Sequence, residues 1–455
     1  MLLPLTSFEE IHWPAIPNQL SSNKLALQYQ LDESQWWTHD KLLKYQLEQL
    51  NLVFQHALKT VPFYTELYKS ALKNNGNITS LNEFSNLSIV TREQIQAAGL
   101  NFVSKNIPKQ HGKIYEKSTS GSTGASLKIK DTDIGNFFFH GFTLRDHLWH
   151  ERDTSKKLAV IRLTHTDEFL PPHGKRYEAW GASSHGVYKS GSSTVLSINA
   201  TIDEQWIWLK KQNPEYLLTY PSALKGLLEK SKKEGRILTN LREVSTLAEI
   251  VTDEMRDTVR KIWNVPLKDM YSSQEVGYMA LQCPDYEHYH VQSESVILEV
   301  LNDNNQSCKP GEIGRVVITT LHNFASPLIR YEIGDYAEVG ETCPCGRGLP
   351  VLNKIMGRER NLVSLPDGSK RWVWVGVDLY GDLINIKKFQ MIQHSLEKIE
   401  VKLVCKPHLT IEQEQALTTK LHETMGYAFQ ITFNYVDNIQ RSKGGKFEDF
   451  ISNVK

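Results

Sequence analysis

The sequence lacks a net charge and any long run of apolar residues. Its 455 residues contain 52 basic and 52 acidic side chains. This balance leaves no net field to hold a polyanion, so we do not expect nucleic acid as a partner. No stretch approaches the ~18 apolar residues of a membrane span. The opening MLLPLTSFEEIHW has neither a basic start nor a small-residue cleavage site. We therefore expect a cytoplasmic protein with no membrane insertion.

Cysteine is scarce, and the chain has no internal repeats. Five cysteines in 455 residues are too few for a secreted disulfide scaffold, although Cys343 and Cys345 lie only one residue apart. Core material is abundant, because 40% of the residues are hydrophobic. A chain of this length is too long to fold around one compact core. We therefore expect a large domain and a smaller one, with a cleft between them.

The pattern of apolar residues predicts an α/β fold. Residues 43–57 have helical spacing, so the first hundred residues read as mainly helical. From about residue 194, short apolar runs alternate with helices, which indicates parallel-rich sheets with flanking helices. Beyond GRERN (357–361) a strand, a helix and a strand predict a small, mobile α+β domain. The predicted domains are 1–357 and 358–455.

Four segments contain residue types suited to nucleotide chemistry. The first, STSGSTG (118–124), packs four hydroxyl residues around two glycines. Such a loop can form an anion-binding concavity, although no Lys follows its second glycine and Gly/Ser loops are more often flexible connections. The second, YSSQEVG (271–277), places Glu275 after an apolar strand. A carboxylate there can bind Mg²⁺, or it can be a surface Glu.

The third and fourth segments lie nearer the end of the chain. In PLIRYEIGDYAEV, Asp335 follows a glycine, and its carboxylate can accept both hydrogen bonds of a ribose diol or occupy an ordinary turn. In RSKGGKFEDF, Lys446 follows two glycines. Its ammonium can stabilise charge on a reacting carboxylate and phosphate, or it can be a solvated tail lysine.

These segments, in this order, resemble those of the adenylate-forming superfamily of acyl-CoA synthetases and peptide-synthetase adenylation domains. The likeness is closer to the phenylacetate–CoA ligase branch, and it extends from about residue 60 through VPFYTELY, TYPSALKGL, CKPGEIGRVVITTL, CPCGRGLP and SKGGKF. It implies that ATP and Mg²⁺ convert a small carboxylic acid into an acyl-AMP, after which the acyl group passes to coenzyme A or another acceptor.

The resemblance also implies roles for individual residues. Glu275 would bind magnesium and Lys446 would drive adenylation, so these two would be catalytic. The nucleotide-binding residues would be Ser118, Thr119, Ser120, Gly121, Ser122, Thr123, Gly124, Ala248, Glu249, Tyr271, Ser272, Asp335 and Arg358. Of these, Ala248 and Glu249 would border the adenine.

The sequence departs from the branch in two places. Relatives usually have an acidic hinge residue where this chain has Arg360, so full rotation of the small domain between half-reactions is less strongly implied. The segment VSLPDGSKRWVWVG lacks the glycine-rich sequence found at this position in the CoA ligases. It looks more like the corresponding segment of capsule-biosynthesis-associated relatives. The acceptor is therefore CoA, a carrier protein or an amine.

The cysteines and histidines of two segments indicate a zinc site. Three thiolates and an imidazole, from Cys283, His290, Cys343 and Cys345, would make a tetrahedral set. His288 competes with His290, and unrelated buried thiols are the alternative. The resemblance favours zinc, which would be structural and would tie the Glu275 loop to the Asp335 loop.

Aromatic residues are candidates for the acid pocket. Phe138 and Phe142 follow the phosphate loop, and Tyr220 begins the helix after a strand. An aromatic pocket would suit an aryl or small apolar acid, whereas helix core is the other interpretation of both Phe residues. A non-catalytic nucleotide-binding relative remains a third hypothesis, and the protein is expected to be a monomer or a homodimer.

Overall fold

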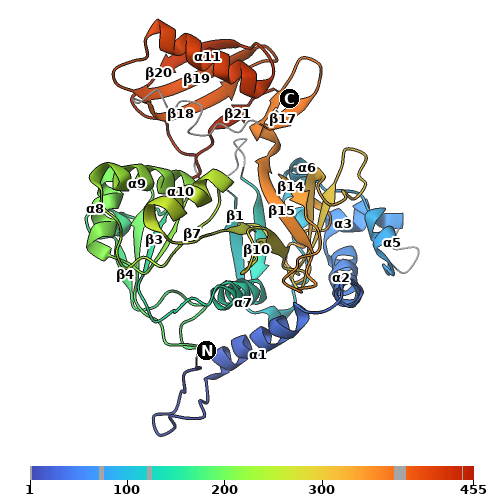
Figure 1. Cartoon of the computed structure of the whole chain (residues 1–455). Coiled ribbons are helices and arrows are strands. Elements are labelled where there is room, and N and C mark those ends of the chain that lie inside the picture. Colours follow the sequence, from blue (N-terminus) through green and yellow to red (C-terminus); the bar gives the residue numbers. More distant parts are fainter. Residues whose placement is uncertain (1–2, 71–75, 120–125, 373–385, 443, 455) are drawn as a thin grey trace. The chain divides into compact units, whose positions relative to one another are not determined.

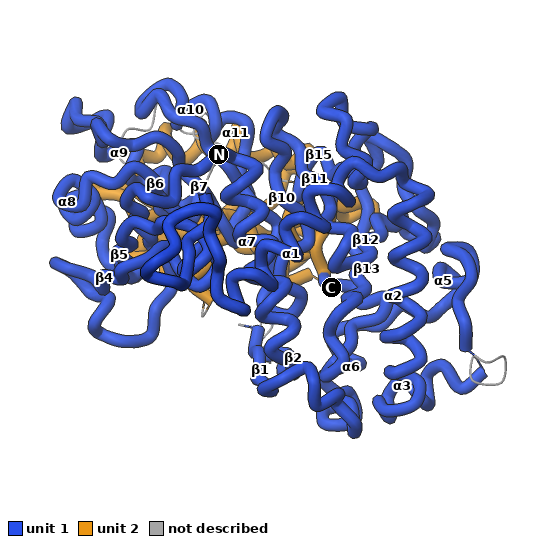
Figure 2. Tube along the Cα trace, turned by 90° about the horizontal axis from the view of Figure 1, so that it is seen from below, with its two compact units in different colours: residues 1–333, 337–355 blue, residues 334–336, 356–455 orange. Residues whose placement is uncertain are grey.

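The structure is a computed structural model that describes residues 3–70, 76–119, 126–372, 386–442 and 444–454. The chain forms two compact units, which Figure 2 shows in different colours. Unit 1 comprises Met1–Ile333 and Ala337–Ile355, and unit 2 comprises Gly334–Tyr336 and Met356–Lys455. Unit 2 therefore begins near the boundary expected at residue 358, but it also takes up three residues from an earlier strand.

The first hundred residues are mainly helical, as predicted. The helices are α1 (Gln19–Ser34), α2 (His39–Thr60), α3 (Pro62–Leu67), α5 (Leu81–Ser85) and α6 (Arg92–Ala98). Asn18 and Thr38 cap α1 and α2 through their side chains. Helix α2 buries one apolar stripe and ends at Thr60, and its C-cap residue Val61 lies directly before Pro62. Its buried side chains from Leu50 onward join the core of the larger sheet of unit 1.

The alternating region forms a six-stranded sheet of order β4-β5-β3-β6-β7-β8. All neighbouring pairs except β4/β5 are parallel, which confirms the parallel-rich prediction. The strands are β3 (Leu158–Arg162), β4 (Lys175–Tyr177), β5 (Ser193–Ser197), β6 (Tyr216–Thr219), β7 (Glu243–Thr246) and β8 (Leu267–Lys268). Figure 1 shows α8 (Ile202–Gln212), α9 (Pro221–Glu234) and α10 (Asp253–Trp263) beside this sheet.

A seven-stranded sheet of order β12-β13-β14-β15-β11-β10-β9 lies beyond it in sequence. The strands are β9 (Met270–Ser273), β10 (Gly277–Gln282), β11 (Tyr289–Val291), β12 (Val296–Leu301), β13 (Ile313–Thr320), β14 (Tyr331–Val339) and β15 (Val351–Arg358). Several of its pairs are antiparallel, as short hairpin connections require. Helix α7 (Asp133–Trp149) follows the hairpin of β1 (Ile114–Ser118) and β2 (Lys128–Thr132), and it contacts α1 (Figure 1).

Unit 2 is the predicted α+β domain. Its four-stranded sheet has the order β20-β19-β18-β21. The strands are β18 (Ile386–Gln393), β19 (Lys398–Cys405), β20 (Gln430–Tyr435) and β21 (Phe450–Ser452). Helix α11 (Ile411–Met425) begins at a Thr410 capping box and ends at left-handed Gly426. It buries Leu417, Leu421 and Met425 in a core shared with β18 and β19.

Unit 2 also contains a short turn and a hairpin that follow β15. The turn η4 (Glu359–Asn361) follows β15, and a hairpin joins β16 (Leu362–Ser364) to β17 (Lys370–Trp372). Among the described residues of both units, no helix has the length and hydropathy needed to cross a membrane.

Candidate active site and metal centre

The predicted phosphate loop stands on the β1–β2 hairpin. Ser118 ends β1 and pairs with Lys128, while Ser120, Gly121, Ser122, Thr123 and Gly124 lie outside the described residues. Buried Thr119 closes the hairpin, because its N–H donates to the carbonyl of Leu127 (2.9 Å) and its Oγ1 accepts from the Leu127 N–H (3.1 Å). The Arg92 guanidinium donates to the same hydroxyl at 2.5 Å. A cation thus lies at the base of this loop, on a helix that sequence reasoning did not connect with it.

Glu275 occupies the tight turn between β9 and β10. Gly277, with φ +90°, pairs with Ser273, and the Val276 N–H donates to Ser273 Oγ at 3.2 Å. The Glu275 residue is only 5% exposed. Its carboxylate has no hydrogen-bond or ion-pair partner among the residues that the structure describes. A buried carboxylate normally has such a partner, so this one is suited to bind a cation. Tyr271 and Ser272 lie on β9, which leads into the turn.

The residues predicted to border adenine follow β7. Ala248 has a left-handed backbone (φ +70°), and the Glu249 N–H donates to the carbonyl of Leu247 at 2.9 Å. The Glu249 carboxylate accepts a hydrogen bond from the Ser222 N–H (2.8 Å), in the first turn of α9. An acidic group there is favourable, because the N-terminus of a helix has free N–H donors and a partial positive charge. The sharp turn after β7 is therefore anchored to α9.

A buried carboxylate links β7 to β9. Asp269, between β8 and β9, accepts hydrogen bonds from Thr246 Oγ1 (2.9 Å) and from the Tyr289 hydroxyl (2.7 Å). Burial raises the pKa of Asp269 to about 6, although the hydrogen bonds and the nearby Arg256 oppose this shift. Thr246 ends β7 and Asp269 precedes β9, so this group fixes the predicted adenine turn relative to the strand that leads to Glu275.

Asp335 and Arg358 lie together in unit 2. Asp335 follows Gly334 on β14, and Arg358 ends β15. Their side chains form an ion pair, with 3.4 Å between Arg358 Nε and Asp335 Oδ1. The two residues that the sequence assigned to the nucleotide are therefore neighbours, although 22 positions separate them in the chain.

Lys446 lies in a loop of unit 2 that contains backbone hydrogen bonds. The Ser442 N–H donates to the carbonyl of Lys446 (2.9 Å), and the Gly445 N–H donates to the carbonyl of Ser442 (2.8 Å). Gly445 has φ +76°, which favours glycine at this position. The Arg441 guanidinium donates to the Gly445 carbonyl at 3.1 Å.

The aromatic candidates for the acid pocket have different surroundings. Phe142 is 1% exposed and packs in a core cluster with Leu27 and Leu31 of α1. Tyr220 belongs to the core of the six-stranded sheet. Phe138 is only partly buried, and its ring stacks on His322 at 3.7 Å between centroids. Of the three, Phe138 is thus the one outside the fully buried core.

A fourth ring lies nearer to the Glu275 turn. Phe139 is 40% exposed and stacks on Tyr278 with 5.0 Å between ring centroids. Its Cδ2 atom is 3.8 Å from the place that a Cβ on Gly277 would occupy. Sequence reasoning missed Phe139, because three consecutive Phe residues on a helix give no signal for which of them faces the site.

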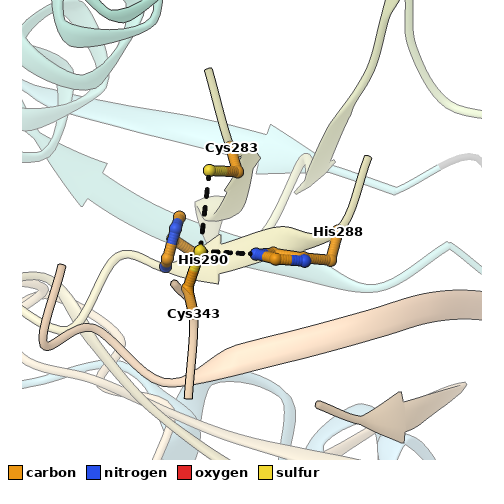
Figure 3. A group of neighbouring side chains, drawn as sticks. All are labelled: Cys283, His288, His290 and Cys343. Atoms are coloured by element: carbon orange, nitrogen blue, oxygen red, sulfur yellow. Dashed lines mark hydrogen bonds between the residues drawn. The ribbon is translucent and has the colours of Figure 1, made fainter. Parts of the chain in front are cut away.

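The cysteines and histidines meet at one end of the seven-stranded sheet (Figure 3). The possible ligand atoms of Cys283, His288, His290 and Cys343 all lie within 4.8 Å of one another. His288 Nε2 is 2.9 Å from Cys343 Sγ, and Cys283 Sγ is 3.9 Å from the same sulfur. This group, the Cys/His cluster, contains His288 where the sequence analysis had placed Cys345.

Cys345 lies directly beside the Cys/His cluster. Its sulfur is 3.5 Å from His290 Nε2, and it forms a second group with Cys283 and Asp285. Burial raises the pKa of Cys283, and it raises that of Cys343 to about 12. Two thiols and two imidazoles converging from two loops match the donors of a closed tetrahedral zinc site.

The Cys/His cluster also contacts α7. The ring of Trp149, at the end of α7, lies edge-on to His290 with 5.9 Å between centroids. The guanidinium groups of Arg145 and Arg347 flank the same indole, at 5.1 and 4.8 Å from its centroid. The Cys/His cluster is thereby packed against the helix that carries Phe138 and Phe139.

Known proteins resemble this chain along nearly its whole length. Protein CapK of Staphylococcus aureus is 23% identical over 447 residues, which cover 91% of this chain and 90% of that protein. A phenylacetate-coenzyme A ligase of Thermus thermophilus is 22% identical over 450 residues, which cover 90% and 95%. The family model described as the CapK C-terminal domain matches residues 378–453.

Solved structures show the same arrangement of elements. A crystal structure of 2-hydroxyisobutyryl-CoA ligase in the postadenylation state, in complex with R3-HIB-AMP, has a TM-score of 0.71 at 14% identity and covers 93% of this chain and 92% of that one. The same ligase with 2-HIB-AMP and CoA has a TM-score of 0.61 at 16% identity, covering 93% and 92%. The predicted fold and the resemblance are confirmed: the chain has the fold of adenylate-forming CoA ligases and is similar to phenylacetate–CoA ligases and CapK.

Proposed function

We propose that this protein is an adenylate-forming ligase. It joins a carboxylic acid to ATP as an acyl-AMP with release of pyrophosphate, and it then transfers the acyl group to a thiol. The observation that carries this proposal is the buried side chain of Glu275 in the turn after β9, whose carboxylate has no partner among the residues that the structure describes. The names of the relatives that are CoA ligases, and the acyl-AMP complexes of structures with the same fold, support the same reaction.

Adenylation needs positive charge, because an anionic carboxylate must approach the α-phosphorus of ATP. A magnesium ion, when bound, would neutralise charge on the departing pyrophosphate. Glu275 would hold that ion, and the loop 118–124 would donate hydrogen bonds to the phosphates. Arg92 adds a guanidinium at the base of that loop.

The remaining residues would bind the nucleotide and the reacting groups. Asp335 would accept hydrogen bonds from the ribose hydroxyls, and Arg358 would contact the nucleotide. Ala248 and Glu249 would border the adenine. Lys446 would donate hydrogen bonds to the carboxylate and the α-phosphate as their charges approach.

The acid would be small and apolar or aromatic. The aromatic side chains on α7, above all Phe138 and Phe139, support this class, because both are less buried than Phe142. We propose coenzyme A as the thiol, since several relatives are named phenylacetate-coenzyme A ligase. A carrier protein or an amine is the alternative acceptor.

We further propose that the Cys/His cluster binds one structural zinc ion. Protein ligands would fill all four positions and leave no place for a substrate, so the ion would fix two loops rather than react. The convergence of Cys283, His288, His290 and Cys343 supports this role.

Acid-dependent exchange of labelled pyrophosphate into ATP tests the proposed function. We expect exchange that requires one acid from a panel of aryl and short-chain acids, and that falls to background without acid. A protein that binds ATP but supports no exchange with any acid would instead be a non-catalytic nucleotide-binding relative.

A further inference from the structure

A half-buried ion pair connects the beginning of unit 2 to the loop of Lys446. Arg360, in η4, donates a hydrogen bond from Nη2 to Glu448 Oε1, and the two side chains are only 20% and 15% exposed. Glu448 is two residues beyond Lys446 in the chain. The neighbouring Asn361 Nδ2 donates to the carbonyl of Phe450 at 2.8 Å. Two side chains of one short turn thus hold the same segment.

The backbone of that segment is fixed from its other side by β18. Gln390 Nε2 donates to the carbonyl of Glu448 (3.0 Å), and the Met391 N–H donates to the carbonyl of Asp449 (2.8 Å). Phe450 then pairs with Met391 in the parallel ladder of β18 and β21. Glu448 is therefore a fixed point from which the chain leads back, through one residue, to Lys446.

We propose that Arg360 is a positioning residue for Lys446, acting through the side chain of Glu448. This inference rests on the proposed function. The Arg360–Glu448 pair sets the place of the Lys446 loop relative to Arg358 and Asp335, which belong to the same unit and form their own ion pair. The lysine and the two nucleotide-binding residues would then move as one body.

The degree of burial separates this pair from an ordinary surface ion pair. Lys370 and Glu359 also form an ion pair at η4, at 2.7 Å, but their side chains are 44% and 57% exposed. Exposed pairs contribute little to stability or geometry. Removing one partner of a shielded pair leaves the other charge without compensation, so its side chain must move to reach water. Glu359 therefore offers a matched control beside Arg360.

The test compares Arg360→Gln, Glu448→Gln, the double variant, the charge swap Arg360→Glu with Glu448→Arg, and the control Glu359→Gln. We expect each single variant at the pair to slow acid-dependent pyrophosphate exchange by about 10- to 100-fold, the range that displacement of a reacting group by about 1 Å produces. Transfer from supplied acyl-AMP should stay within about threefold. The double variant should be no slower than the slower single variant, and the swap should restore part of the rate.

Hydrogen exchange gives a readout that does not need catalysis. The Ser442 and Gly445 amides, which donate within the Lys446 loop, should exchange faster in Arg360→Gln and Glu448→Gln than in the wild type or Glu359→Gln. Additive rate losses, unchanged amide exchange, or damage confined to acyl transfer would each overturn the proposal. A wild-type protein without pyrophosphate exchange would instead contradict the proposed function, while the amide measurement would still test the ion pair.

Discussion

At the scale of single residues, the proposed chemistry depends on charges placed at the ends of strands and in tight turns. Glu275 is buried in a turn that needs a left-handed glycine, and Lys446 follows another left-handed glycine. Both positions hold a charged side chain on a backbone with little freedom. Because such a backbone is already ordered, little conformational entropy is lost when the charge is placed against a substrate.

Replacement of Glu275 by Gln should separate the two half-reactions. The amide keeps the shape of the side chain but loses the charge that binds magnesium. We expect pyrophosphate exchange to fall by about 100-fold or more, in the range seen when one electrostatic contact in a transition state is removed. Transfer from preformed acyl-AMP should change little. Comparable losses in both steps would contradict this division of labour, and Glu287→Gln is the surface control.

Replacement of Lys446 by Ala should have the same pattern for a different reason. The ammonium is needed where the carboxylate and the α-phosphate approach each other, and hydrolysis or thiolysis of acyl-AMP has no such requirement. We expect acyl-AMP formation to become undetectable in a single-turnover assay while acyl-AMP hydrolysis continues. Equal loss of both activities would refute the assigned role.

At the scale of elements, the predicted site is supported by links between strands and helices that are distant in sequence. Asp269 ties β7 to β9, and the Cys/His cluster ties the β10–β11 hairpin to the connection between β14 and β15. Each link holds a turn that carries a predicted site residue. The two links should respond differently to pH and to chelators.

The Asp269 link should weaken as the pH rises. The folded-state pKa of about 6 lies above the ordinary value of 3.8, so the folded state binds a proton more tightly than the unfolded state does. This contribution to the unfolding free energy is fully present below about pH 4 and is lost as the pH rises through about 6, with an upper bound of about 3 kcal/mol.

Urea unfolding at pH 5 and pH 7.5 measures this effect. We measure the free energy of unfolding of the wild type relative to that of Asp269→Asn. This relative stability should be lower at pH 7.5 than at pH 5 by about 1–2 kcal/mol, since about 1.4 kcal/mol corresponds to one pKa unit. A difference that does not depend on pH would show that Asp269 has the same proton affinity in both states. Asp257→Asn, on the exposed side of α10, is the control.

The Cys/His cluster should bind one zinc ion per chain. Cys343→Ser and His288→Ala should both lower the zinc content of protein purified without added metal, whereas Cys345→Ser should leave most of it. The reverse result for His288 and Cys345 would restore the set expected from the sequence. Wild-type protein that contains no zinc, with stability unchanged by a chelator, would exclude the site.

Hydrophobic periodicity was enough to predict the mainly helical first hundred residues, the strands that alternate with helices, and α11, because the period of each element can be read within its own residues. The order of the seven-stranded sheet could not be predicted in this way, since its pairs join residues as distant as Tyr289 and Leu352. The same limit applies to the site. His288 and Cys345 flank one cluster from two loops, and no spacing in the sequence shows which of them completes it.

At the scale of the whole molecule, the two units have separate cores. The core of unit 2 is built from β18, β19 and α11, and its members do not occur in the clusters of unit 1 among the described residues. Domains with separate cores can unfold in separate transitions.

Met391→Ala should test this independence. Met391 is fully buried in the core of unit 2, and such a truncation costs about 2–5 kcal/mol. We expect calorimetry to show two transitions, of which one moves to lower temperature and the other stays in place. Leu209→Ala, in the core of the six-stranded sheet, should move the other transition. A single transition that shifts with both variants would show that the units unfold together.

The assignment of Gly334–Tyr336 to unit 2 has a practical consequence for dissecting the protein. The chain passes between the units at three places: after Ile333, after Tyr336 and after Ile355. A single truncation after Ile355 would leave Asp335 in one fragment and Arg358 with Lys446 in the other. The first fragment would then hold all of unit 1, but the second would lack Gly334–Tyr336 and would not be a complete unit 2. Splitting this protein into two complete units that can be mixed and reassembled therefore requires moving the β14 segment Gly334–Tyr336 onto the second fragment, and one cut is not enough.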